Sequence, residues 1–430
     1  MRSNPENFEE DNNKRTQLLV KYACDRIKAV LDSIRQLKAS EFPYPDSKDA
    51  LCRIETLFED VLKRLSAIDA DPSYIRQLCS ISLRHLFIYL PILGFILRST
   101  NVRNAFETFG PLRDIARKAL DPKVKLLLSS EWAYSPMIYH EIRVLPGFVL
   151  IGLPASESSN PLVIPLCGHE LGHAVWTRNK DELENITKNV FYEEAPKYIT
   201  TNWQKYKELF VPSINEPSNN LGTDIFASTM LWQILKLLFK QAEECFCDFI
   251  GLKIFGSAFL HSFAYLCSPC LSSPRPITYP QLMKRVKYLV KAAKEYQLEV
   301  PKSYENMFKN RTEPQLASMD KLRLSISDYM LDKITDDMIA KAGDIISETN
   351  IARPSDEESK RIRNRLELVV PASRCKSLTD ILNASWQAYH DIDLWKSIPD
   401  VLERKDQILK DLVLKNIEIF EVEQILNGGK

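Results

Sequence analysis

The feature of this 430-residue sequence that most restricts its fold is a regular three- and four-residue spacing of apolar positions in its first part. Between residues 14 and 38 these positions are Leu19, Ala23, Ile27, Val30, Ile34 and Leu37. Apolar side chains at this spacing form one stripe along an α-helix. The same spacing continues through residues 48–67, 73–98 and 103–120. The whole chain has only 12 glycines, and we therefore expect a mainly α fold.

The composition is that of a packed globular protein, with 45% hydrophobic and 10% aromatic residues. The 57 basic and 57 acidic residues give a formal net charge of zero. Bulk electrostatics therefore provide no attraction for nucleic acid or for an anionic membrane. We expect no nucleic-acid partner.

Residues 86–97 form the longest apolar run, which contains Pro91 and is shorter than the roughly 20 residues that a bilayer requires. This run predicts a buried, kinked core helix and no membrane span. Residues 1–15 are polar and lack the apolar segment of a secretory signal. Nine cysteines without a framework spacing are typical of thiols in a reducing compartment. Together these features predict a cytoplasmic protein.

The pattern of the sequence divides the chain into three regions. Residues 1–121 are predicted to be helical. Residues 122–300 begin with two strand-like segments, Val124–Leu128 and Ile142–Leu153, and continue with helices. Residues 301–430 are predicted to be helical again. The expected fold class is therefore α+β, mainly α, with a small β-sheet in the central region.

The strongest motif is His169-Glu170-Leu171-Gly172-His173, within a helix predicted from Ile164 to Trp176. Residues four apart share a helix face, so both imidazoles point to one place and Glu170 lies beside them. This is the HExxH pattern, in which two histidines bind zinc and the glutamate is the general base. Burying these groups without a metal is costly. The sequence therefore predicts a zinc site.

A site with two histidines needs a third protein ligand. Glu244 and Asp248 lie four residues apart in an apolar helix that is predicted to end near Phe255. One carboxylate at this spacing can bind zinc while the other accepts a hydrogen bond from a ligating histidine. Glu243 has no acidic residue four positions later, and we therefore predict Glu244 as the ligand.

An HExxH pattern followed by a Glu-x-x-x-Asp helix resembles the gluzincin metallopeptidases. The resemblance covers roughly residues 122–295 and implies a zincin-like catalytic core that hydrolyses peptide bonds. It implies that His169, His173 and Glu244 hold the zinc and that Asp248 supports a histidine. It also implies that Glu170 takes a proton from a zinc-activated water and passes it to the leaving amine.

The resemblance extends to Thr278-Tyr279-Pro280 and Arg285, because prenyl-protease-like gluzincins carry Thr-His-Pro and then Arg after the ligand helix. Here a tyrosine replaces that histidine. Tyr279, Arg285 and His261 are the candidates to donate a hydrogen bond to the developing oxyanion. The segment Ile142–Leu153 is predicted to be an edge strand along which an extended protein or peptide substrate pairs.

Two other functions are consistent with the sequence. One is a helical interaction or scaffold protein with a structural zinc site, although such a site has no use for Glu170. The other is a regulated protease within a cytosolic stress or defence assembly, whose helical flanks contact an oligomeric or regulatory partner. Secondary candidates for metal or redox chemistry are the Cys267–Cys270 pair, Cys245, Cys247 and His140.

Overall fold

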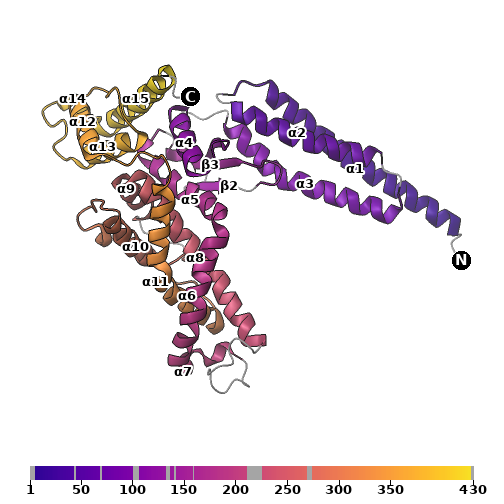
Figure 1. The fold of residues 1–430 in the computed structure, drawn as a ribbon. Coiled ribbons are helices and arrows are strands. Elements are labelled where there is room, and N and C mark those ends of the chain that lie inside the picture. The colour runs from indigo at the N-terminus through magenta and orange to yellow at the C-terminus, as the bar shows by residue number, and fades with distance from the viewer. Residues whose placement is uncertain are drawn as a thin grey trace. The chain divides into compact units, whose positions relative to one another are not determined.

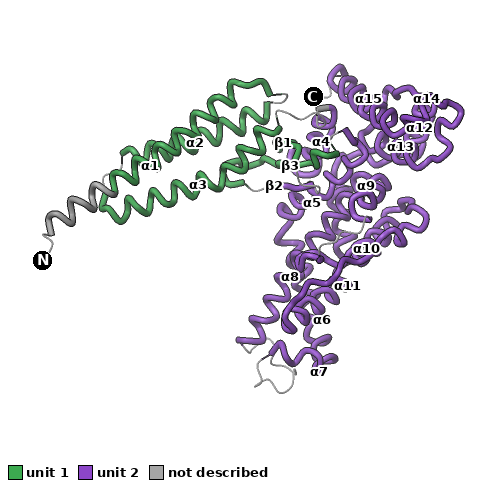
Figure 2. The backbone as a smooth tube through the Cα atoms, turned by 180° about the vertical axis from the view of Figure 1, so that it is seen from behind, with its two compact units in different colours: residues 1–106, 123–134, 139–158 green, residues 107–122, 135–138, 159–430 purple. Residues whose placement is uncertain are grey.

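The computed structural model describes residues 5–42, 45–67, 70–99, 106–131, 136–139, 142–157, 159–210, 225–268 and 274–427. The fold is mainly α with one small sheet, as the sequence predicted (Figure 1). The chain forms two compact units, coloured green and purple in Figure 2. Each unit is described by itself below.

Unit 1 comprises residues 1–106, 123–134 and 139–158. Its elements are α1 (Pro5–Ala39), α2 (Pro45–Ser66), α3 (Pro72–Ser99), β1 (Lys125–Glu131), β3 (Phe148–Pro154) and η1 (Ala155–Glu157). The apolar stripes of the three helices meet in a core that also contains Leu127 and Leu150 of the strands. Asp46 of α2 accepts a hydrogen bond from the backbone N–H of Leu126, which ties the helices to β1.

The sheet has the strand order β1–β3–β2, where β2 is Met137–Tyr139, and β1 pairs with β3 in parallel. The two predicted strand segments are confirmed as β1 and β3. The prediction that residues 142–153 supply an edge strand is wrong, because β3 lies between β1 and β2. Every residue of β3 is buried, as its continuous apolar run Phe148–Leu153 requires.

Helix α3 contains the apolar run of residues 86–97, with Pro91 inside the helix. Its Phe87 and Ile88 are 62% and 51% exposed, so the run is not fully buried as predicted. Of the helices that the structure describes, α3 is the one long and apolar enough to cross a membrane, with 39% of its most apolar window buried. A core helix of a soluble protein has the same properties, and the expected absence of a membrane span stays a prediction.

Unit 2 comprises residues 107–122, 135–138 and 159–430. Its longer helices are α4 (Phe106–Ala119), α5 (Cys167–Arg178), α6 (Lys180–Thr201), α8 (Ile225–Phe255), α9 (Ser257–Cys267), α10 (Leu282–Glu295), α11 (Ser318–Ser347), α12 (Asp356–Glu367), α13 (Leu378–His390) and α15 (Lys405–Leu426). Its short elements are η2 (Pro161–Leu166), α7 (Trp203–Tyr206), η3 (Lys207–Leu209), η4 (Tyr304–Met307) and α14 (Pro399–Leu402). Helix α8 is the centre of this unit and packs against both α5 and α11.

The two units differ from the three regions that the sequence predicted. Strands β1 and β3 belong with the N-terminal helices, because their apolar side chains complete that core. Residues 301–427 do not form a separate body, because α11 covers α8 and α13 packs against α9. Asn383 of α13, for example, donates to the backbone carbonyl of Phe255 at the end of α8.

Candidate metal centre

The site rests on an unusually close approach of α5 and α8. A Cβ atom built on Gly172 would lie 2.6 Å from the Cα atom of Cys247, and one on Gly168 would lie 2.7 Å from the Cα atom of Gly251. Any side chain larger than hydrogen at Gly168 or Gly172 would therefore push the two backbones apart. These glycines are four residues apart and flank His169, so the helix face that carries the motif is held against α8.

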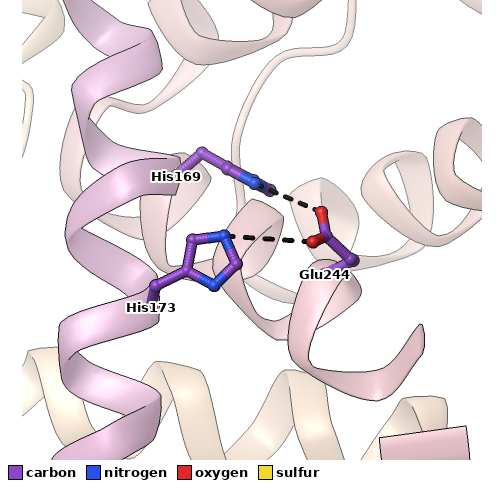
Figure 3. A group of neighbouring side chains, drawn as sticks. All are labelled: His169, His173 and Glu244. Atoms are coloured by element: carbon purple, nitrogen blue, oxygen red, sulfur yellow. Dashed lines mark ion pairs between the residues drawn. The ribbon is translucent and has the colours of Figure 1, made fainter. Parts of the chain in front are cut away.

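His169 and His173 project from α5 toward the carboxylate of Glu244 on α8 (Figure 3). The distance from His169 Nε2 to Glu244 Oε2 is 3.4 Å, and that from His173 Nε2 to Glu244 Oε1 is 4.0 Å. One potential ligand atom from each residue lies within 4.8 Å of the others. Zinc binds such atoms at about 2.0–2.2 Å, which places two ligands of a tetrahedral ion about 3.3–3.5 Å apart. The donor types suit zinc, and the 3.4 Å pair has the spacing of two zinc ligands, whereas the 4.0 Å pair is wider by about 0.5 Å.

The other ring nitrogen of each histidine contacts a carboxylate. His169 Nδ1 lies 2.8 Å from Asp248 Oδ1, and His173 Nδ1 lies 3.0 Å from Glu243 Oε1. A neutral imidazole that donates its Nδ1–H to a carboxylate has a lone pair on Nε2. Both Nε2 atoms are therefore oriented as metal ligands, each with its own supporting carboxylate.

The charge around His169 also favours a cation. Burial disfavours the imidazolium, but hydrogen bonds to Asp248 and Glu244 outweigh burial and raise the pKa of His169 to about 10. The Oε2 atom of Glu244 is buried, and among the described residues its contact is the ion pair with His169 Nε2 at 3.4 Å. A metal ion bound by this oxygen would satisfy it and would replace the Nε2 proton of His169.

Arg285 of α10 fixes Asp248 from behind. Its Nε and Nη2 atoms each donate to an oxygen of Asp248 at 2.8 Å, and Asp248 is 1% exposed. Burial opposes ionisation, but Arg285 and His169 lower the pKa of the Asp248 carboxyl. The structure thus places Arg285 in a chain from Arg285 to Asp248 to His169, where it holds a carboxylate in position. This placement differs from the oxyanion-donor role suggested by the sequence.

Glu170 lies next to His169 on α5 and is 7% exposed. Burial raises the pKa of its carboxyl, and the nearby imidazoles of His169 and His173 partly oppose that shift. Glu244 and Arg285 also act on this carboxyl electrostatically. Glu170 is therefore at the same site as the three potential ligands, without being one of them.

Tyr279 reaches the site from the loop before α10. Burial raises the pKa of its phenol to about 12, with smaller contributions from the negative charges of Glu244 and Glu170. The Arg285 guanidinium carbon lies 5.6 Å from the centre of the Tyr279 ring. Tyr279 thus lies beside Arg285 and is electrostatically coupled to Glu244 and Glu170, and its role as an oxyanion donor stays a prediction.

A buried polar network anchors the Tyr279 loop. The Gln241 side chain on α8 donates to the backbone carbonyl of Ile277 and to Asp328 of α11, and it accepts from Ser327. Arg275 at the start of the loop donates to Asp328 at 2.8 Å. The loop is therefore tied to both α8 and α11, one helical turn from Glu244.

The remaining candidates are not among the three potential ligands. His261 stacks against Trp386, and its pKa is lowered to about 4 by burial and by His390. Burial raises the pKa values of Cys245 and Cys247, which are buried thiols. Cys267 of α9 has a pKa raised by burial to about 11. His140 and Cys270 lie outside the residues that the structure describes.

Two features of the site were not predicted from the sequence. Glu243 has no acidic residue four positions later and was not expected to take part, although it contacts His173. The available signal was the position of Glu243, which directly precedes Glu244 of the potential ligand group. The second feature is the close contact of α5 and α8. Its signal in the sequence was the four-residue spacing of Gly168 and Gly172, which puts both glycines on one helix face.

Comparisons with known proteins give no further assignment. No protein-family model matches the chain, and no curated protein or solved structure matches it either.

Proposed function

We propose that this protein is a zinc-dependent peptidase with one catalytic centre in unit 2. The observation that carries the proposal is the pairing of each histidine with its own carboxylate, while both Nε2 atoms face Glu244. His169, His173 and Glu244 would hold the zinc. When bound there, zinc acts as a Lewis acid on a carbonyl and lowers the pKa of a coordinated water.

The other residues have separate roles in this proposal. Glu170 is the general base that accepts a proton from the attacking water and delivers it to the leaving amine. Tyr279 donates its phenolic hydrogen to the oxygen on which negative charge develops. Asp248 and Glu243 orient the imidazoles, and Arg285 fixes Asp248. We propose proteins or peptides as substrates.

The presence of Glu170 favours a catalytic site over a structural one. A structural zinc site is closed by four protein ligands, whereas the group here offers three. An additional buried carboxylate beside the ligands is costly and serves no purpose in a site that only stabilises the fold.

The test is hydrolysis by zinc-loaded protein, with Glu170→Gln as the matched control because it keeps the size and shape of the side chain. Each protein is incubated with a mixture of peptides from a proteome digest, and new termini are identified by mass spectrometry. We expect new cleavages with the wild type and none with Glu170→Gln. Equal cleavage by the two proteins, or no cleavage by zinc-loaded wild type, would contradict the proposal.

A further inference from the structure

A second cavity lies along the same helix as the proposed zinc ligand. It has a volume of about 370 Å³, in the range of small-ligand pockets. Its apolar wall consists of Leu237 on α8, Ile277, Leu316 and Leu324. All of its lining residues belong to unit 2.

The spacing along α8 connects this cavity to the metal centre. Leu237 precedes Glu244 by seven residues, which is close to two helical turns, so both side chains lie on one face of α8. At 1.5 Å per residue they are about 10 Å apart along the helix axis. Gln233, which also lines the cavity, lies one further turn away on this face.

The loop before α10 gives an independent measure of the same distance. Ile277 lines the cavity, and its backbone carbonyl accepts a hydrogen bond from Gln241, which lies three residues before Glu244 on α8. Three residues of helix rise about 4.5 Å along the axis. The cavity and the proposed catalytic centre are therefore neighbours that share both α8 and this loop.

We infer that this cavity is a substrate subsite for an apolar side chain. An extended peptide advances about 3.3 Å per residue, so a side chain in the cavity belongs to a residue about three positions from the cleaved bond. The leucine and isoleucine walls select an aliphatic or aromatic side chain over a charged one, because a charge would lose its hydration there. This inference rests on the proposed peptidase function.

The polar side of the cavity does not change this preference. Arg323 Nη1 donates to Asp320 Oδ1 at 2.9 Å, and Arg323 Nη2 contacts the sulfur atoms of Met230 and Met319. The guanidinium charge is thus paired with Asp320 within the lining itself. The buried Nε atom of Arg323 has no hydrogen-bond partner among the described residues, and Gln233 is a further polar lining residue, so the apolar wall is one part of the recognition surface.

The test compares the cleavage preferences of four zinc-loaded proteins, the wild type and three variants, on one library of proteome-derived peptides. In Leu237→Trp a large ring fills the cavity, and in Ile277→Ala the cavity is enlarged at a position that is 44% exposed. Ile225→Trp is the matched control, because Ile225 is 73% exposed at the start of α8 and does not line the cavity.

We expect the wild type and Ile225→Trp to prefer apolar side chains at one position two to four residues from the cut. Leu237→Trp should lose this preference by at least about tenfold, the lower end of what one methylene contributes in a hydrophobic pocket. Ile277→Ala should shift the preference toward larger side chains, with zinc content unchanged. Cleavage without such a preference, or the same preference in all variants, would overturn the subsite while the peptidase function stands. Absence of cleavage by the wild type would overturn both.

Discussion

His173 and Glu243 share a hydrogen bond, with His173 Nδ1 3.0 Å from Glu243 Oε1. Burial opposes ionisation of this carboxyl, but hydrogen bonds from His173 and Lys240 lower the pKa of Glu243 to about 2. Glu243 is therefore an ionised partner that orients one proposed ligand, while Glu244 is itself a proposed ligand. The adjacent glutamates have different roles.

This relationship changes the expected behaviour of Glu243 variants. From the sequence, Glu243 was expected to be dispensable for zinc binding. The structure instead predicts that Glu243→Ala weakens zinc affinity by about 10–100-fold, the usual effect of removing such a partner. Competition with a chromophoric chelator measures this affinity. Glu193→Ala on the surface of α6 is the control, and wild-type affinity in Glu243→Ala would show that His173 needs no support.

The pair of Arg285 and Asp248 predicts a large effect on stability. Arg285→Ala leaves the buried Asp248 carboxylate without its main partner, and loss of one member of such a pair costs about 3–5 kcal/mol. Urea unfolding of the zinc-free protein measures the change. The double variant Asp248→Asn/Arg285→Met removes both charges and should be less destabilised than Arg285→Ala. A larger loss of stability in the double variant than in Arg285→Ala would mean that the ion pair itself stabilises this part of the core.

Asp248→Asn alone tests the support of His169. The asparagine oxygen still accepts a hydrogen bond but lacks the charge that Arg285 and His169 share. We expect zinc to bind with an affinity reduced by about 10–100-fold, and turnover to fall with it. Wild-type affinity and turnover in Asp248→Asn would restrict this residue to a structural role.

Tyr279→Phe separates catalysis from packing. Like an ordinary tyrosine hydroxyl, the phenol has a pKa far above neutral pH, so it stays protonated and able to donate. Removal of one oxyanion donor typically lowers turnover by about 100–1,000-fold. Zinc content and the unfolding midpoint should not change. Unchanged turnover would show that the Tyr279 ring only packs against its neighbours.

Gly172→Ala tests the close contact of α5 and α8. The added methyl group would meet the backbone of Cys247 at 2.6 Å, so the helices must separate. We expect a loss of about 1–3 kcal/mol in the free energy of unfolding, as is usual for overpacked cores, and weaker zinc binding. Gly94→Ala on α3 is the control, because its methyl group would meet only the flexible end of Arg98 at 3.3 Å. Equal free energies of unfolding in Gly172→Ala and Gly94→Ala would contradict the close contact of α5 and α8.

The lowered pKa of His261 predicts that stability depends on pH in a way that does not involve the metal site. Its pKa is about 4 in the folded protein, against about 6.5 in an unfolded chain. As pH falls from 6.5 to 4, the unfolded state takes up a proton that the folded state does not, so stability decreases in this window. His261→Phe keeps an aromatic ring beside Trp386 and should flatten the pH dependence. If the stability of His261→Phe depends on pH as steeply as that of the wild type, groups other than His261 cause the dependence.

The grouping of His169, His173 and Glu244 and the contact of Asp248 with His169 were predictable, because one helix period fixes which side chains share a face. The support of His173 was not predictable in this way, because it depends on how α8 is rotated relative to α5. That rotation is set by the contacts of Gly172 with Cys247 and of Gly168 with Gly251, which pair residues far apart in the sequence. The position of Arg285 depends similarly on tertiary packing, since α10 brings it behind Asp248.

The helices of the chain were predictable from apolar spacing, but the division into units was not. The strands β1 and β3 follow α4 in the sequence, and their side chains nevertheless complete the core of α1, α2 and α3. Local patterns do not indicate which helices a strand will pack against. For the same reason, the central position of β3 in its sheet could not be inferred from its own residues.

The most direct test of the zinc assignment is elemental analysis of the purified protein after equilibration with zinc. We predict about one zinc per chain in the wild type and in Glu170→Gln, because Glu170 is not a ligand. His169→Ala, His173→Ala and Glu244→Gln should each lose most of the metal. Full zinc content in any of these three variants, or a wild type without zinc, would contradict the account.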